Sequence, residues 1–332
     1  MTSFELPWHN ALWERYQRLV DQGILPHALL FVGVPGVGKR QFAERLIRYL
    51  LCHSRTGSGR HCGQCHACHL THAETHPDVR YVVPEEKSSV VKVDQIRVCN
   101  EFVLKSSQQG FYKVAVVDPA EAMMTAAANA LLKTLEEPPA KTLLLLISDR
   151  PGLILPTIRS RCQVVNFDVP ASPIALDWLE SQTQGGTSAD IALKLAGGAP
   201  LVALDALASG DIEQNIAMTK DLASLLKREV LPSQVATSWI KQAGQPEVVV
   251  KRMLQWIQAT LRFSCAGQDS LLDWMPGATV FRYLAEKNDS QMLFSVHDQL
   301  TEALVYLQQS NPNPTLLLEK LLFGWLKLMP GK

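Results

Sequence analysis

The sequence predicts an α/β protein in its first half and an all-helical protein in its second half. Short apolar runs alternate with helical patterns up to about residue 168, as in a doubly wound parallel sheet. A glycine-rich loop joins one such run to a helical segment. Beyond about residue 209 the apolar residues recur with helical spacing.

Four strands and four helices are expected in the first half. The strands span residues 27–32, 78–83, 114–118 and 142–148, and the last is an almost unbroken apolar run, typical of a central strand. The helices span residues 41–51 and 120–135, and two more begin near residue 92, with Asp94 as a cap, and at Ser172. Pro138 and Pro139 are expected to stop the helix at 120–135, because proline lacks an N–H.

A phosphate-binding loop is expected directly after the first strand. Gly33, Gly36 and Gly38 would let backbone N–H groups point at phosphate oxygens, and Lys39 would reach the outer phosphates. The next residue should carry a hydroxyl that holds Mg²⁺, but it is Arg40, which cannot ligate a cation. The strand–loop–helix setting favours a nucleotide loop over an ordinary glycine-rich turn. Whether a nucleotide still binds stays open.

The acidic half of such a site is also incomplete. The strand at 114–118 ends in Asp118, which stands where a working hydrolase has its metal-side aspartate. In such a hydrolase an acidic residue beside this aspartate activates water. The next residue is Pro119, which offers no base, and Glu121 lies two residues further on. Because the hydroxyl for magnesium and the base are both missing, we expect no hydrolysis at this site.

Four of the seven cysteines predict a structural metal site over about residues 52–68. Cys52, Cys62, Cys65 and Cys68 have the spacing C-x9-C-x2-C-x2-C, in which close pairs can place two sulfurs on one ion. A closed tetrahedral zinc site is favoured, an iron–sulfur cluster is the rival, and free thiols are the third alternative. Nearby histidines could replace a ligand: His53, His61, His66, His69 and His72.

Composition limits the classes of function. Lys and Arg number 32, as do Asp and Glu, so the formal net charge is zero, which argues against a dedicated nucleic-acid binder. Arg97, Lys105 and Lys113 are interpreted as solvated charges. No apolar stretch reaches the roughly 18 residues that cross a bilayer. The start at 1–5 lacks a secretory pattern, so a reducing, cytoplasmic location without disulfides is expected.

One arginine is a candidate for chemistry outside its own chain. Ser160-Arg161-Cys162 follows the strand at 142–148. The planar guanidinium of Arg161 stays charged and matches phosphate oxygens, so it could act as an arginine finger on a transferring phosphoryl group of another subunit. The alternative is a surface arginine paired with a nearby acid. Arg159 is interpreted as a solvated or interface charge.

Two strings carry a family resemblance. Residues 129–139 read Asn-Ala-Leu-Leu-Lys-Thr-Leu-Glu-Glu-Pro-Pro, and the Ser-Arg-Cys triplet follows at 160–162. Together they resemble the AAA+ clamp-loader subunits of DNA replication, over nearly the whole chain and most weakly after about residue 210. The defective loop and the cysteine module narrow the resemblance to a subunit type of the bacterial DNA polymerase III holoenzyme.

The resemblance implies three domains and several residue roles. The domains are an AAA+ domain with the zinc insert (1–168), a small helical lid (169–208) and a helical collar for oligomerisation (209–332). Arg161, with Ser160, is implied as a finger that acts in trans. Ser148 is implied as a phosphate sensor, or else is a strand-end hydroxyl that caps the next turn. Leu201 stands where a lid arginine would bind phosphates.

The implied function is that of a non-hydrolysing clamp-loader subunit, not catalytic alone. It would belong to the DNA-directed DNA polymerase holoenzyme, a nucleotidyltransferase complex, and would activate the clamp-loader ATPase in trans while the sliding clamp is loaded onto primed DNA. The implied partners are delta- and gamma/tau-type subunits in a hetero-oligomer, the sliding clamp and, through the complex, primed DNA. Two alternatives stay open, an autonomous AAA+ ATPase with a divergent loop and a zinc-dependent DNA-binding module.

Overall fold

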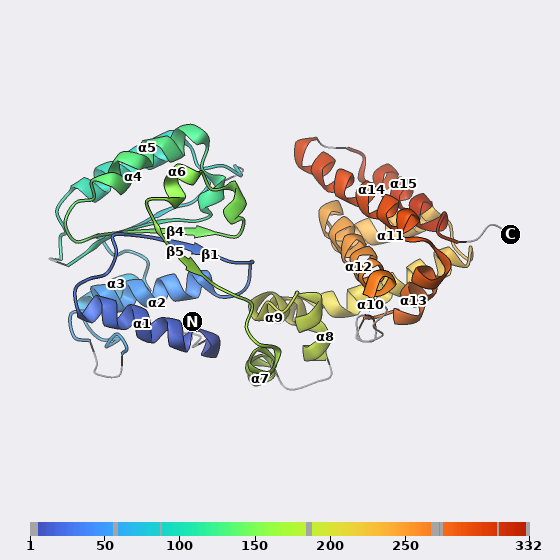
Figure 1. Cartoon of the computed structure of the whole chain (residues 1–332), viewed down its shortest axis with the longest axis horizontal. Helices are drawn as coiled ribbons and strands as arrows, with labels where there is room; N and C mark the ends of the chain where they lie inside the picture. The colour runs from blue at the N-terminus through green and yellow to red at the C-terminus, as the bar shows by residue number, and fades with distance from the viewer. Residues whose placement is uncertain are drawn as a thin grey trace. The chain divides into compact units, whose positions relative to one another are not determined.

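The first compact unit is built on a five-stranded parallel sheet (Figure 1). The structure is a computed structural model that describes residues 6–55, 59–86, 88–109, 111–183, 188–266, 272, 275–310 and 312–329. The strands are β1 (Ala28–Val32), β2 (Val79–Val82), β3 (Lys113–Val117), β4 (Thr142–Ser148) and β5 (Gln163–Asn166). They lie in the order β2-β3-β4-β1-β5, so the strand before the glycine loop lies next to β4.

Helices cover both faces of this sheet (Figure 1). The elements around the strands are η1 (Pro7–His9), α1 (Asn10–Asp21), α2 (Lys39–Leu51), α3 (His66–His72), α4 (Val93–Leu104), η2 (Ala120–Ala122), α5 (Thr125–Glu136), η3 (Pro151–Leu153), α6 (Pro156–Arg159) and α7 (Ser172–Gln182). Because strand side chains alternate, Leu29 and Phe31 pack with α1 and α2, whereas Leu30 and Val32 pack with α4, α5 and α6. The expected doubly wound arrangement is confirmed.

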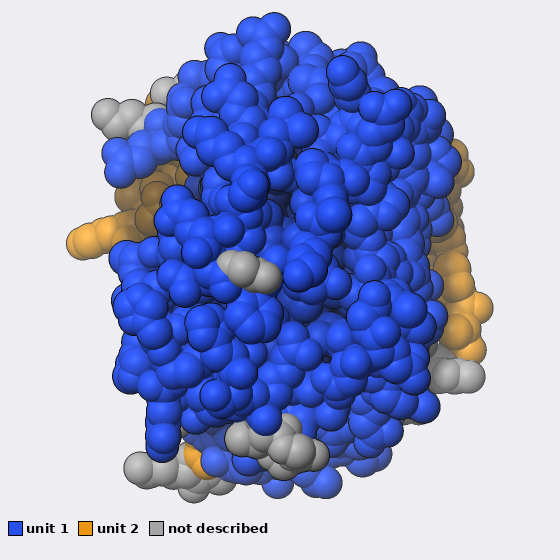
Figure 2. Space-filling model, turned by 90° about the vertical axis from the view of Figure 1, so that its left-hand side faces the viewer, with its two compact units in different colours: residues 1–182, 198–202 blue, residues 183–197, 203–332 orange. Residues whose placement is uncertain are grey.

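The second compact unit is helical. The units comprise Met1–Gln182 with Gly198–Val202, and Thr183–Gly197 with Ala203–Lys332 (Figure 2). The remaining helices are α8 (Ser188–Leu195), α9 (Pro200–Ser209), α10 (Asp211–Leu226), α11 (Pro232–Ala243), α12 (Pro246–Ala266), α13 (Ala278–Lys287), α14 (Ser290–Gln309) and α15 (Pro314–Leu326). The expected helical second half is confirmed. The proposed boundaries at residues 168 and 208 stay predictions.

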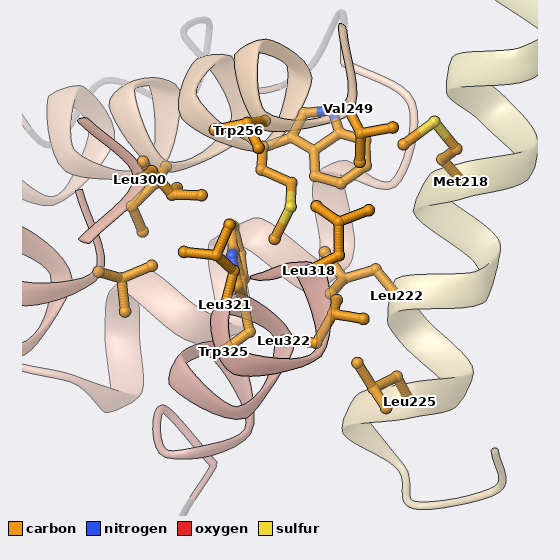
Figure 3. Packing of buried hydrophobic residues seen from close by; sticks show 14 of the residues in the cluster. Met218, Leu222, Leu225, Val249, Trp256, Leu300, Leu318, Leu321, Leu322 and Trp325 are labelled. Atoms are coloured by element: carbon orange, nitrogen blue, oxygen red, sulfur yellow. The ribbon is translucent and has the colours of Figure 1, made fainter. Parts of the chain in front are cut away.

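Three tryptophans anchor the core of the second unit. Trp239, Trp256 and Trp325 are fully buried, and Figure 3 shows Trp256 and Trp325 among leucines of α10, α14 and α15. The Trp256 and Trp325 rings meet edge to face, with centroids 6.4 Å apart. The Trp256 indole N–H donates to Asn215 Oδ1 at 3.2 Å, so this polar atom is satisfied inside the core.

The four expected strands are confirmed to within one residue at either end, and a fifth was missed. β5 (Gln163–Asn166) pairs with β1 at the edge of the sheet. Both of its terminal residues are polar, and it is only four residues long. No apolar run therefore marks it in the sequence, and its pairing with β1 is what makes it a strand.

Three local expectations are wrong. The expected helix at 120–135 is broken, because the N–H of Met124 donates to the Val91 carbonyl, which leaves η2 and α5 as separate elements. Asp94 does not cap α4; it lies in the first turn, and the preceding Lys92 is the N-cap residue. Lys113 is not solvated, because it is buried against Asp78, with Nζ 3.2 Å from Oδ1.

Some expectations lie outside the described residues. They are the absence of a secretory pattern at 1–5 and the parts of the proposed lid and collar domains that fall on residues 184–187, 267–271, 273–274, 311 and 330–332. Among the residues that are described, we find no helix both long and apolar enough to cross a bilayer.

Candidate functional site

The lysine of the phosphate loop is bound by its own chain. Lys39 begins α2 and is buried, with an exposed fraction of 4%. Its Nζ donates to the carbonyls of Gly33 and Val34 at 2.6 and 2.7 Å and lies 2.6 Å from Asp149 Oδ1. These three partners match the three N–H donors of an ammonium group. A bound phosphate would have to displace them.

Two loop glycines allow other parts of the chain to approach closely. Gly36 and Gly38 have φ of +80° and +95°, which favour glycine. A Cβ on Gly36 would lie 2.5 Å from Val202 Cγ2, and a Cβ on Gly38 would lie 2.3 Å from Leu6 Cδ1. The Leu201 N–H also donates to the Gly36 carbonyl at 3.1 Å. The loop therefore has the positive φ angles that glycine allows, and neighbouring segments pack closely against it.

Arg40 is paired with the acid that would hold a magnesium ion. Its Nη2 donates to Asp118 Oδ1 at 3.0 Å, and its Nε donates to Oδ2 of the same carboxylate. This hydrogen bonding raises the pKa of Arg40 above its ordinary value. Glu121 accepts a backbone hydrogen bond: its Oε1 accepts from the Asp149 N–H at 3.1 Å. The acids of the site thus hold the chain's own cations and backbone.

The hydroxyl at the end of β4 caps a turn. Ser148 is fully buried, and its Oγ accepts from the Arg150 N–H at 3.2 Å. This contact is the one expected of a strand-end hydroxyl. A role as a phosphate sensor stays a prediction.

A buried histidine fixes the other side of the loop. His9 Nε2 donates to the Val37 carbonyl at 3.0 Å, and Trp8 Nε1 donates to the same carbonyl at 2.9 Å. Burial lowers the pKa of His9 to about 4. The ring is therefore neutral at pH 7, and its one proton is on Nε2, where it serves the loop.

The buried His9 predicts that stability falls below pH 6.5. The unfolded chain gains its proton near pH 6.5, whereas the folded chain gains it near pH 4, so this contribution is complete above pH 6.5 and is lost towards pH 4. We expect the unfolding free energy of the wild type to fall by about 1–2 kcal/mol more than that of His9→Gln between pH 7.5 and pH 5. Denaturant unfolding at both pH values measures this. Parallel pH profiles would contradict it.

Arg161 lies at the surface, beside the end of α5. Its Nε and Nη2 are 2.8 and 2.6 Å from Glu136 Oε1, and its Nη1 donates to the Thr157 carbonyl at 3.0 Å. Ser160 Oγ accepts from the same Nη1 at 3.3 Å. The guanidinium is thus paired with an acid of its own subunit, while 36% of the side chain stays exposed. Arg159, by contrast, is exposed at the end of α6.

The four cysteines of the predicted metal site come together. The Sγ atoms of Cys52, Cys62, Cys65 and Cys68 all lie within 4.8 Å of one another, and no histidine belongs to this described group. Cys52 directly follows α2, and Cys68 lies within α3. The cluster therefore joins the two helices.

The donor chemistry fits a structural zinc ion. Four Zn–S bonds of about 2.3 Å would place neighbouring sulfurs about 3.8 Å apart, and the Cys62 and Cys68 sulfurs are 3.9 Å apart. Hydrogen bonds from the backbone of Gln64 and Cys65 lower the pKa of Cys62 to about 6, which favours the thiolate that a metal binds. Burial raises the pKa of Cys52 and of Cys68, so the assignment rests on the positions of the sulfurs. The Cys62 N–H in turn donates to Cys52 Sγ at 3.3 Å. These residues could hold zinc in a closed tetrahedron.

Three residues of the site were missed by reasoning from sequence. Asp149 follows β4, and only the neighbouring position of β4 and β1 brings it to Lys39. Glu136 was seen only as part of a family string, although it pairs with Arg161. His9 precedes the first long helix and carries no pattern of its own. Of the three, only Asp149 had a sequence signal that could have identified it, because it is a carboxylate directly after a predicted strand.

Sequence comparisons find DNA polymerase III subunits as relatives of this chain. Residues 8–171 match the model of a family described as DNA polymerase III, delta subunit. DNA polymerase III subunit delta′ of Pseudomonas aeruginosa is 36% identical over 328 residues, which cover 98% of each chain. Subunit delta′ of Yersinia pestis is 36% identical over 83% of this chain and 78% of the relative. Subunit delta′ of Escherichia coli is 38% identical over 62% and 61%.

One solved structure shares the fold. A DNA polymerase III gamma subunit-related protein from Thermotoga maritima superposes with a TM-score of 0.53 and 19% identity, over 95% of this chain and 98% of that chain. A match over 95% of this chain includes residues of both compact units.

Proposed function

The chain belongs to the family of DNA polymerase III delta′ subunits, and on that premise we propose that it is a clamp-loader subunit that hydrolyses no ATP itself and supplies Arg161 to the ATP site of a neighbouring subunit. The family resemblance inferred from the two sequence strings is confirmed. The finer assignment is supported by two observations. Lys39 and Arg40 are held by the two acids of the loop site, Asp149 and Asp118. Arg161 lies outside that site, where it is partly exposed and pairs with the partly exposed Glu136.

The absence of ATP hydrolysis at this chain's own loop is proposed from the pairing of Lys39 and Arg40. ATP hydrolysis of this kind needs a magnesium ion between the β- and γ-phosphates and a residue that orients water. Arg40 takes the carboxylate that would face the metal, and Glu121 is held by the Asp149 backbone. The nucleotide loop then serves as a rigid part of an AAA+ domain rather than as a catalytic loop.

The donated arginine follows from the chemistry of phosphoryl transfer. Negative charge grows on the transferring group, and a guanidinium fixed in place stabilises it without reorganisation. Arg161 follows the short α6, whose packing on α5 positions its backbone, and its side chain is partly exposed and can be reached by a partner. In this proposal Ser160 and Thr157 orient the guanidinium, and the four cysteines hold a structural zinc ion that stabilises the insert.

The proposed partners follow from the family. They are delta- and gamma/tau-type clamp-loader subunits and, through the complex, the sliding clamp and primed DNA. The AAA+, lid and collar domains keep their proposed boundaries at 1–168, 169–208 and 209–332. No observation in the described residues favours the autonomous ATPase, and the zero net charge argues against an independent DNA-binding module.

The direct test is reconstitution. The purified chain is mixed with delta- and gamma/tau-type subunits, and complex formation and ATP turnover are measured together. We expect a stable complex whose turnover depends on this chain. A chain that stays apart from these subunits, or a complex whose turnover is the same without it, would refute the proposed function.

Restoring the missing hydroxyl should not restore hydrolysis. Arg40→Thr frees Asp118, but the base is still absent and Lys39 still pairs with Asp149. We therefore expect phosphate release by isolated Arg40→Thr to stay at the background level of Lys39→Ala. Steady-state phosphate release by the isolated wild type, Arg40→Thr and Lys39→Ala chains measures this. Turnover that appears in Arg40→Thr and disappears when Lys39→Ala is added would show that the site can hydrolyse ATP.

A further inference from the structure

The acid that holds Arg161 lies at a defined point of the fold. Glu136 is the last residue of α5, and Pro138 and Pro139 prevent the helix from continuing. α5 packs on α6, which brings this carboxylate beside the Ser-Arg-Cys triplet. The next residue, Glu137, is exposed, and its carboxylate has no ion pair among the residues that the structure describes. Position in the helix, rather than charge alone, selects Glu136.

Most of the guanidinium is engaged on its own subunit. An arginine has five N–H donors. The Nε–H and one N–H of Nη2 point to Glu136 Oε1. The N–H groups of Nη1 donate to the Thr157 carbonyl and to Ser160 Oγ. A phosphate group needs the same donors and the same positive charge. The contact with Glu136 therefore competes with the proposed use of Arg161.

We propose that Glu136 is a positioning residue that holds the Arg161 guanidinium on its own subunit and releases it to nucleotide phosphates of the neighbouring subunit. This inference rests on the proposed function, because it requires Arg161 to act in trans. The exposed fractions of the Arg161 and Glu136 side chains are 36% and 49%. An ion pair this exposed is weak, so the exchange for a more highly charged and bidentate phosphate is favourable.

The competition has a measurable consequence. Only the fraction of Arg161 that is free of Glu136 can engage a phosphate, so the apparent kcat/KM of the neighbouring site equals its intrinsic value multiplied by that fraction. Removing the competing charge raises the fraction without adding a contact. The freed guanidinium stabilises both the bound nucleotide and the transition state, so the change is expected in kcat/KM.

The test is Glu136→Gln in the reconstituted complex. It keeps the size of the side chain and removes the charge, and we expect kcat/KM for ATP to rise about two- to fivefold. The gain should shrink as ionic strength rises, because salt weakens the pair in the wild type. Glu137→Gln is the matched control and should change nothing. An unchanged or lowered kcat/KM in Glu136→Gln would overturn the inference.

A second variant separates this inference from the proposed function. In a complex that carries Arg161→Ala, adding Glu136→Gln should have no further effect, since the two residues act as a pair. A low rate in Arg161→Ala together with an unchanged rate in Glu136→Gln would overturn the role of Glu136 and leave the proposed function of Arg161 intact. An unchanged rate in Arg161→Ala would overturn the proposed function and this inference with it. Complex formation is measured for each variant, so a loss of assembly is detected separately.

Discussion

Replacing Arg161 with alanine is expected to lower ATP turnover at the adjacent subunit's site by about three to five decades, the usual contribution of an arginine finger. Assembly should survive, because the Glu136 pair that is lost is partly exposed and contributes about 0–1 kcal/mol. The rate is measured in complexes in which that adjacent site alone can hydrolyse ATP. Otherwise turnover at the remaining sites would hide the effect.

Two variants control for charge and for place. Arg161→Lys keeps the positive charge but loses the planar fork, so most of the activity should still be lost. Arg159→Ala removes an exposed arginine two residues away and should leave turnover unchanged. Equal losses in Arg159→Ala and Arg161→Ala would mean that net charge, not a placed guanidinium, matters. Full turnover in Arg161→Ala would exclude the finger.

Removing the metal should unfold the cysteine insert and spare the sheet. Structural zinc in small peptides contributes about 10–16 kcal/mol, far more than a glycine- and histidine-rich insert can gain from its apolar residues. We expect about one zinc ion per chain, and after chelation or Cys65→Ser the amides of residues 59–72 should exchange as in an unfolded peptide. The amides of β1 and β4 should stay protected, since they lie in a sheet covered on both faces.

Matched variants define the reach of this site. Cys265→Ser changes an exposed cysteine outside the cluster and should alter neither zinc content nor exchange. The loss of amide protection after zinc removal should not extend into α2, because Leu46 and Leu50 are packed in the core that covers the sheet. Loss of protection in β1 or β4 would mean that the metal holds the whole unit. If the purified chain contained iron and had a visible absorption band, the four cysteines would hold an iron–sulfur cluster and not zinc.

Local patterns predicted much of the sheet and its connections. The run that became β4 is apolar between its two terminal hydroxyl residues and is buried along its whole length, as its sequence predicted for a central strand. β5 could not be predicted in this way, because pairing with β1 rather than its own composition defines it. The break between η2 and α5 was hidden for the same reason, since Val91 supplies the hydrogen bond from a distant segment.

By itself, the sequence determined the alternation of strands and helices, the glycine loop with its misplaced Arg40, the cysteine spacing and the family. These features depend on neighbouring residues, so periodicity and residue chemistry suffice to read them. Only the tertiary structure decided that Lys39 pairs with Asp149 and that Arg161 pairs with Glu136. Each of these pairs joins residues far apart in the chain. The order of strands and the packing of α5 on α6 set their distances, and no local pattern encodes either.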